Sequence, residues 1–194
     1  MKYDMSRLEK LLILLSTNIG SEKLFELILK EAMTITNCDG GTLYTLEGDQ
    51  LVFRHVYTKS KYVEMTSRTG SSMIPPVPMM RSYVCAYCAM MQKRLNIPDV
   101  YRSNEFDFTG TKDYDRMNHY RTQSMLVMPM VVSEGDVIGV LQLINAMDAH
   151  GAVLPFTKEH ETAATALCSI AALYIENWML KRKIEKLEKQ GEEI

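Results

Sequence analysis

Two nearly continuous apolar runs, residues 124–132 and 137–145, constrain the fold of this chain more than any other feature. The short polar sequence Ser133-Glu134-Gly135-Asp136 separates them. A strand with one face in water alternates apolar and polar residues, whereas a strand covered on both faces is apolar throughout. The two runs therefore predict strands at the centre of a sheet.

A second pair of strand-like segments lies earlier in the chain. Residues 42–46 and 51–57 are rich in β-forming side chains and flank Glu47-Gly48-Asp49, whose Gly-Asp pair indicates a hairpin turn. Residues 38–41, with two glycines, are expected to be a break, and the polar stretch 58–73 is expected to be a loop.

Helical spacing of apolar residues accounts for most of the remaining chain. Helices are expected at residues 5–19, 21–36, 80–93, 112–120 and 157–189, and a short edge strand at residues 95–98. This order predicts an α+β fold in which helices collect on one side of an antiparallel sheet.

The long C-terminal helix changes character along its length. Its first half is small and apolar, which suits packing against a sheet. Its second half has heptad spacing, with Leu173, Leu180, Leu187 and Ile194 at one seam position and Asn177, Ile184 and Gly191 at the other. We therefore divide the chain into an N-terminal dimerisation or linker helix (1–20), a globular domain (21–178) and a coiled-coil linker toward a C-terminal effector (179–194).

Composition disfavours several classes of protein. The formal net charge is −2, with 22 basic and 24 acidic side chains well mixed, so no concentrated basic face for nucleic acid is expected. No run approaches the ~20 apolar residues of a membrane span, and no membrane partner is expected. The 4 cysteines do not suggest a disulfide scaffold, and the expected location is the cytoplasm.

Three ordered blocks of sequence resemble the GAF family. They are LNIPDVY at 95–101, YRTQSMLVMPM at 120–130 and VIGVLQLIN at 137–145. The likeness runs from about Ser21 to Trp178 and is closest to the GAF domains of cyclic-nucleotide phosphodiesterases and bacterial signalling proteins. The resemblance implies a central antiparallel sheet of five or six strands, helices on one face that dimerise, and a ligand pocket on the other.

The resemblance also implies a set of ligand-binding residues. Carried over by position, they are Tyr57, Thr58, Arg81, Ser82, Asp115, Asn118, Thr122 and Gln142. Tyr57 could stack on a planar ligand, and amides at a helix N-terminus near Arg81 would attract an anion. Packing is the alternative for Tyr57 and Thr122, and a hydrogen bond to neighbouring backbone is the alternative for Gln142.

The sequence departs from the cyclic-nucleotide pattern. Members that bind cyclic nucleotides carry a Lys and an Asp that pair across the pocket. Here Ala146 follows Asn145, and three residues separate Phe156 from His160-Glu161. Without that ion pair, cyclic AMP and cyclic GMP are disfavoured and another small ligand is favoured.

Cys85 and Cys88 form a Cys-x-x-Cys sequence, which can indicate a redox pair or half of a metal site. No second pair completes a zinc site, so no metal is expected and structural cysteines are preferred. Some GAF domains reduce methionine sulfoxide, but their reacting cysteine precedes the RT block, where residues 116–124 contain none. We therefore expect no enzymatic activity and no catalytic residues.

The resulting hypothesis is a regulatory GAF domain of a bacterial signalling protein. It would bind a small molecule and pass the signal through a helical homodimer to a covalently linked C-terminal effector. The alternatives are a dimerisation module with a vestigial pocket and, more weakly, a cysteine-dependent methionine sulfoxide reductase.

Overall fold

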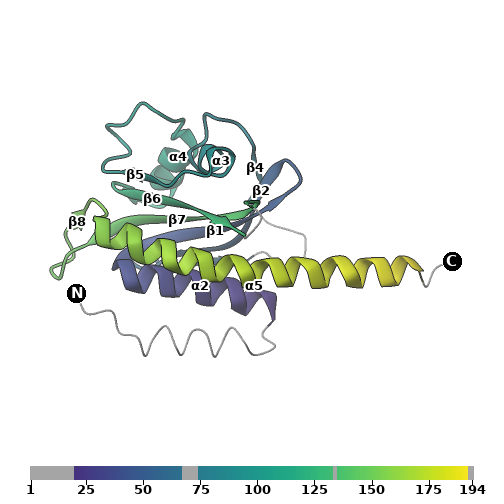
Figure 1. Ribbon diagram of the computed structural model, residues 1–194. Coiled ribbons are helices and arrows are strands. Elements are labelled where there is room, and N and C mark those ends of the chain that lie inside the picture. Colours follow the sequence, from purple (N-terminus) through teal and green to yellow (C-terminus); the bar gives the residue numbers. More distant parts are fainter. Residues whose placement is uncertain (1–19, 67–73, 133–134, 192–194) are drawn as a thin grey trace.

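The computed structural model describes residues 20–66, 74–132 and 135–191 (Figure 1). The helices in these ranges are α2 (Ser21–Thr36), α3 (Val84–Met91), α4 (Thr109–Met117) and α5 (Lys158–Gly191). The strands are β1 (Cys38–Glu47), β2 (Gln50–Thr58), β3 (Val63–Thr66), β4 (Val77–Pro78), β5 (Leu95–Ile97), β6 (Met125–Val131), β7 (Val137–Met147) and β8 (Val153–Leu154). The expected helix at 5–19 and the seam residue Ile194 lie outside the described residues.

The two apolar runs form β6 and β7, which lie in the middle of one antiparallel sheet. The main strand order is β3-β2-β1-β7-β6-β5, while β4 pairs with β2 and β8 pairs with β7. β1 and β7 approach very closely at Gly139, where an added Cβ would lie 2.3 Å from the carbonyl oxygen of Tyr44. The predicted α+β fold, with an antiparallel sheet of six main strands and a long C-terminal helix, is confirmed.

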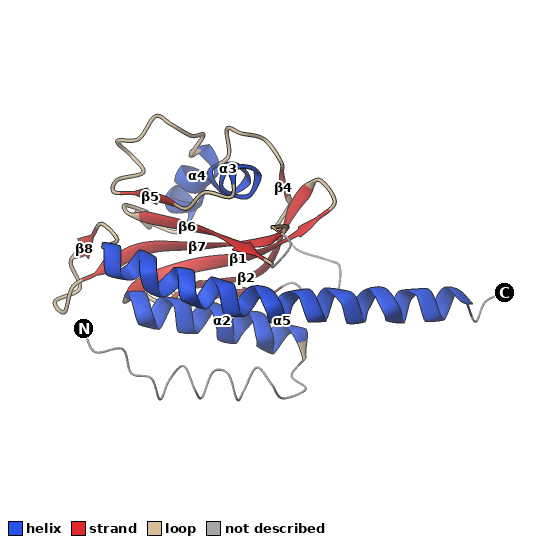
Figure 2. Cartoon of the chain, in the orientation of Figure 1, coloured by secondary structure: helices blue, strands red, loops and turns tan. Residues whose placement is uncertain are grey.

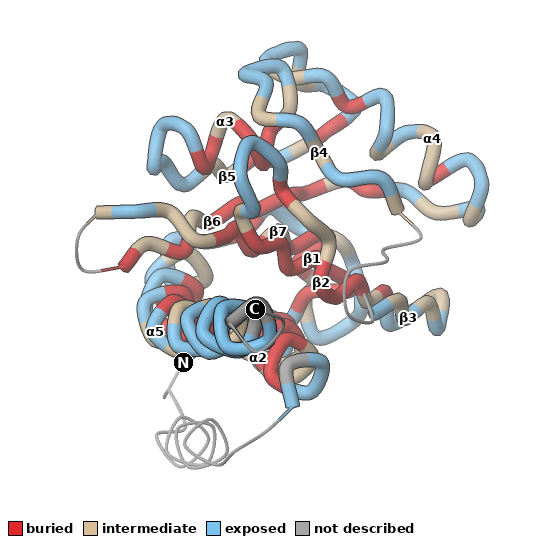
Figure 3. The backbone as a smooth tube through the Cα atoms, turned by 90° about the vertical axis from the view of Figure 1, so that its right-hand side faces the viewer, coloured by how far each residue is buried: buried red, intermediate tan, exposed pale blue. Residues whose placement is uncertain are grey.

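Each face of the sheet carries its own layer (Figure 2). α2 and α5 lie side by side on one face, and the shorter α3 and α4 lie over the other. Strand alternation supplies both cores: Leu141 and Leu143 of β7 pack under α2 and α5, whereas Val140 and Ile144 pack toward α3. Figure 3 shows the buried residues concentrated along the sheet and where α2 and α5 meet it.

α5 changes its environment along its length. Ala164, Leu167 and Ala171 are at most 1% exposed, because they pack in the core beneath the sheet. The C-terminal part extends away from the sheet (Figure 1), and Leu180 and Leu187 are 53% and 59% exposed. Among the described helices, α5 alone is long and apolar enough by composition to cross a membrane, a test that a partly buried core helix also passes.

Several sequence expectations need correction. Residues 38–41 are not a break but the start of β1, because Gly40 and Gly41 let neighbouring strands approach. An added Cβ on Gly41 would lie 2.7 Å from the Gln142 carbonyl oxygen, so this glycine serves the strand ladder rather than a turn. The expected loop at 58–73 contains β3, which pairs with the end of β2.

The helices over the second face also differ in their bounds. α3 is shorter than expected because residues 80–83 form turns before it, and α4 begins at Thr109 rather than at residue 112. The two-residue strand β8 was not expected; it pairs with the end of β7 across the short connection at residues 148–152. By contrast, α2 has the predicted bounds.

Candidate functional site

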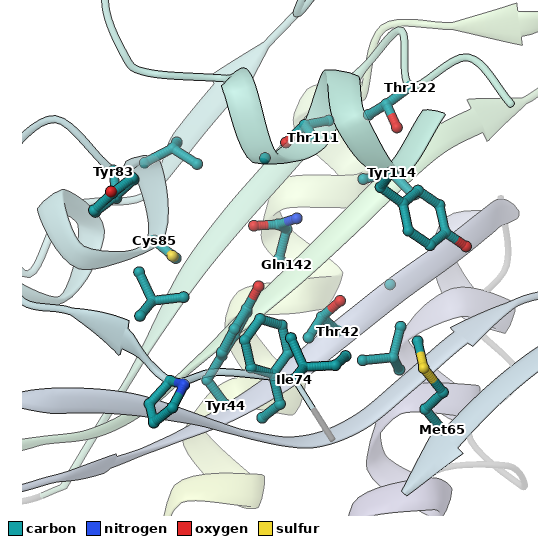
Figure 4. Close-up of a pocket in the computed structure, with 18 of the residues that line it drawn as sticks. Thr42, Tyr44, Met65, Ile74, Tyr83, Cys85, Thr111, Tyr114, Thr122 and Gln142 are labelled. Atoms are coloured by element: carbon teal, nitrogen blue, oxygen red, sulfur yellow. The ribbon is translucent and has the colours of Figure 1, made fainter. Parts of the chain in front are cut away.

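A cavity of about 400 Å³ lies between the sheet and the layer that contains α3 and α4 (Figure 4). Its floor is the face of β1, β2 and β7 that is turned away from α2 and α5. Its walls come from the start of α3, from α4, from Met65 of β3 and from residues 74–78. Cavities of this size commonly hold small organic ligands.

The floor is built by strand alternation and strand register. Thr42 of β1 lies opposite Gln142 of β7, so both side chains stand on the same face of the sheet. Tyr44, two residues beyond Thr42, also faces the cavity and packs on Phe53 of β2 with ring centroids 4.7 Å apart. The floor therefore combines an aromatic pair with polar groups.

The roof is tied to the floor by one hydrogen bond. Tyr114 of α4 and Thr58 at the end of β2 both line the cavity, and their hydroxyl oxygens are 3.1 Å apart. Tyr83, just before α3, and Cys85 of α3 line the cavity on another side (Figure 4). The contact between Tyr114 and Thr58 closes the gap between α4 and the sheet.

Gln142 supplies an unpartnered amide at the centre of the floor. It is the only polar residue between Val137 and Ile144, and its half-buried side chain points into the cavity (Figure 4). No hydrogen bond of the described residues involves this side-chain amide, so the alternative of a bond to neighbouring backbone is not realised. A partly buried amide retains donors and an acceptor that a bound molecule can use.

A GAF family model matches residues 21–175. This chain belongs to the GAF family. Over 130 residues it is 30% identical to the dual 3',5'-cyclic-AMP and -GMP phosphodiesterase 11 of Drosophila melanogaster, covering 62% of this chain but only 8% of that protein.

Solved structures confirm the GAF fold. The GAF domain of a phosphoenolpyruvate-protein phosphotransferase from Coxiella burnetii superposes with a TM-score of 0.69 at 11% identity, over 92% of this chain and 96% of that one. The GAF domain of a two-component sensor histidine kinase from Bacillus halodurans gives 0.60 at 15% identity, over 84% and 97%. The chain thus shares its fold with GAF domains that occur in signalling proteins.

The structure places three of the expected ligand residues of this GAF domain at the cavity, namely Thr58, Thr122 and Gln142. Asp115 is elsewhere: it is 2% exposed and its carboxylate is fully engaged inside the protein. Its oxygens accept hydrogen bonds from the Thr122 amide at 2.7 Å, the Thr122 hydroxyl at 2.8 Å and the Tyr101 hydroxyl at 2.9 Å. Asp115 therefore holds α4 against the segment before β6.

Tyr57 lies on the wrong face of the sheet to stack on a ligand in the cavity. Its ring packs against the core beneath α2 and α5, and the Lys30 ammonium lies 4.8 Å from the ring centroid. Because Thr58 faces the cavity, its neighbour Tyr57 must face the other way.

The remaining expected residues are also outside the cavity lining. Arg81 and Ser82 are exposed in the turn before α3, whose first helical residue is Val84. Asn118 donates a hydrogen bond to the Tyr114 carbonyl at 2.9 Å and ends α4. These three residues do not join Gln142 in one site.

The cysteines of the GAF domain are all free and buried. Cys85 lines the cavity, and burial raises the pKa of its thiol to about 11. Cys88 does not line the cavity, and burial likewise raises its pKa. A neutral thiol is a poor nucleophile, and the described residues contain no cluster of three metal-binding side chains.

The aromatic residues of the cavity were not identified from the sequence. The missed residues are Tyr44, Phe53, Tyr83 and Tyr114. Alternation along β1 provided a signal for Tyr44, because Tyr44 lies two residues from Thr42, which pairs with Gln142. Phe53 had no such signal, because β2 contains a bulge at Arg54 that reverses its alternation.

Proposed function

We propose that this GAF domain is a regulatory module that binds a small molecule in the cavity between its sheet and α3–α4. The observation that carries the proposal is the unpartnered Gln142 amide on the floor of a largely apolar, partly open cavity. A half-buried amide that faces a cavity keeps its donors and its acceptor available to a bound molecule. A bacterial signalling protein, acting in the cytoplasm and without nucleic acid or a membrane as partner, is the setting that we propose.

The signal would pass through α5 to a second copy of the domain. The exposed residues Leu173, Leu180, Ile184 and Leu187 form an apolar stripe at heptad spacing along this helix. Pairing of two such stripes would bury their apolar side chains. The paired helices would then lead into a covalently linked C-terminal effector. A ligand can bias this pairing only if it binds two packings of the dimer with different affinities.

The cysteine in the cavity favours a binding role without catalysis. Cys85 is the one cysteine among the described lining residues, and its thiol is protonated at neutral pH. A sulfoxide reductase needs a thiolate that attacks and a second thiol that resolves the intermediate. Cys88 packs in the core around α3, so the two cysteines do not face a shared substrate.

Native mass spectrometry of the protein as purified, compared with a denatured sample, tests this proposal. Extra mass that is lost on denaturation, and that is absent from the Gln142→Leu variant, is expected for a ligand held in the cavity. A dimer without bound mass, and without a thermal shift in a metabolite panel, would favour the alternative of a dimerisation module with a vestigial cavity.

A further inference from the structure

We propose that the cavity takes an uncharged heteroaromatic molecule that presents a hydrogen-bond donor beside an acceptor, as a purine base or a ring carboxamide does. This inference rests on the proposed function and specifies the chemistry of its ligand. Three properties of the cavity lead to it: the aromatic side chains around it, the amide on its floor and the absence of a cation among its described lining residues.

Aromatic rings border the cavity from several elements. Tyr44 and Phe53 come from the sheet, Tyr83 precedes α3, and Tyr114 belongs to α4. The rings of Tyr44 and Phe53 are inclined at 53° to each other, so they present an edge and a face rather than a flat stack. Flat ligands gain favourable stacking and edge contacts from such walls, whereas an aliphatic chain gains only burial.

The Gln142 amide is suited to read one edge of a planar ligand. A glutamine side chain offers an N–H donor and a C=O acceptor side by side, and it can pair with a complementary edge such as that of adenine. The hydroxyls of Thr42 and Thr111 also line the cavity. Because the amide has no partner within the described protein, pairing with a ligand would not break an existing bond.

The charges around the cavity disfavour an anion. Among the described lining residues there is no Lys, Arg or His, and the single carboxylate is that of the exposed Asp107. Burial raises the pKa of the Tyr44 hydroxyl well above its usual range, so this group is neutral. A phosphate would lose water without gaining a positive partner from these residues, which makes an uncharged ligand the better fit.

Calorimetric titration with matched probes tests the inference. Adenine, hypoxanthine and nicotinamide are the uncharged probes, and adenosine is compared with adenosine 5'-monophosphate, which adds only the phosphate. At least one uncharged ring is expected to bind, and the monophosphate is expected to bind at least about tenfold more weakly than adenosine. Gln142→Leu keeps the bulk of the side chain and should weaken binding by about tenfold to a hundredfold. Tyr57→Phe, on the opposite face of the sheet, is the control and should leave binding unchanged.

The outcomes separate this inference from the proposed function. Tighter binding of the monophosphate, or an affinity that Gln142→Leu does not alter, would overturn the inference while leaving a ligand-binding domain. The inference is likewise overturned, and the ligand-binding domain retained, if no probe binds and native mass spectrometry identifies a bound anion or aliphatic compound. If the probes fail and no bound mass is found, both the inference and the proposed function are overturned.

Discussion

Arg54 of β2 lies over Trp178 of α5, with its guanidinium carbon 5.2 Å from the indole centroid. The Arg182 guanidinium lies 5.0 Å from the same ring, and Phe25 of α2 meets it edge-on at 4.9 Å. Arg54 also forms an ion pair with Glu47 and donates a hydrogen bond to the Thr45 hydroxyl at 2.7 Å. The bulged strand that carries Phe53 into the cavity is thereby joined to α5 where this helix leaves the sheet.

The first prediction concerns this contact. A double-mutant cycle of Arg54→Ala and Trp178→Ala should show a coupling of about 1 kcal/mol in the free energy of unfolding, because a desolvated cation over an indole ring contributes more than an exposed one. Arg182→Ala should lower the free energy of unfolding by less than Arg54→Ala does, because the Arg182 side chain is 30% exposed. Strict additivity of the two changes in urea denaturation would show that Arg54 and Trp178 act independently.

The second prediction assigns Asp115 a structural role. Asp115→Ala should lower the free energy of unfolding by about 3 kcal/mol, because it leaves buried donors of Thr122 without an acceptor. Asp113→Ala on the same helix should change stability by only about 0.5 kcal/mol, because its ion pair with Arg116 is exposed. Urea denaturation of Asp115→Ala and Asp113→Ala compares their free energies of unfolding. A stable Asp115→Ala protein that had lost ligand binding would point instead to a ligand contact.

The third prediction compares two glycines. Gly139→Ala should destabilise the domain by about 3 kcal/mol or more, because the new methyl group would lie 2.3 Å from a backbone oxygen of the neighbouring strand. Gly110→Ala in α4 meets nothing within 4 Å and should stabilise by about 0.5 to 1 kcal/mol through helix propensity. Thermal unfolding should move the two variants in opposite directions. Similar melting temperatures would contradict the close approach of β1 and β7.

The fourth prediction is a pH dependence centred on His55. This side chain is 1% exposed, with Nε2 3.1 Å from Glu64 and Nδ1 3.0 Å from the Thr66 hydroxyl. Lys30 bridges Glu64 and Glu26 beside it. Desolvation by burial lowers the pKa of His55 below its usual value despite Glu64.

The sign of the effect follows from that direction. A histidine with a lowered pKa in the folded state resists protonation, so its contribution to stability is full above pH 6.5 and is lost as the pH falls toward the folded pKa. His55→Gln should therefore flatten the fall in stability between about pH 7.5 and about pH 5.5. Because the pKa of His160 is lowered by burial too, His160→Gln is measured in parallel. An unchanged slope in His55→Gln would contradict the prediction.

The fifth prediction tests the proposed pairing through α5. Leu180→Glu and Leu187→Glu place charges in the exposed apolar stripe and should shift a dimer toward monomer in light scattering. Lys189→Glu changes the charge of an exposed residue on the side of the helix away from the stripe and should leave the dimer intact. A wild-type monomer at micromolar concentration would count against signalling through paired helices.

The sequence determined the main elements of the fold because local patterns report burial. Continuous apolar runs identified β6 and β7 as central strands, and helical spacing identified α2 and α5. The same patterns failed at Gly40 and Gly41, which look like a turn in sequence. Only the neighbouring strands reveal that these glycines are needed for a close approach.

The cavity was decided largely by tertiary structure. Thr58 and Tyr57 were both expected at the ligand, although adjacent residues of a strand face opposite sides. The bulge at Arg54 then reverses the alternation of β2 and brings Phe53 to the cavity, which a count along the sequence does not reveal. Gln142, carried over from the family resemblance, does line the cavity. Asp115 was misassigned because its partners, Tyr101 and Thr122, meet it only when α4 packs against the segment before β6.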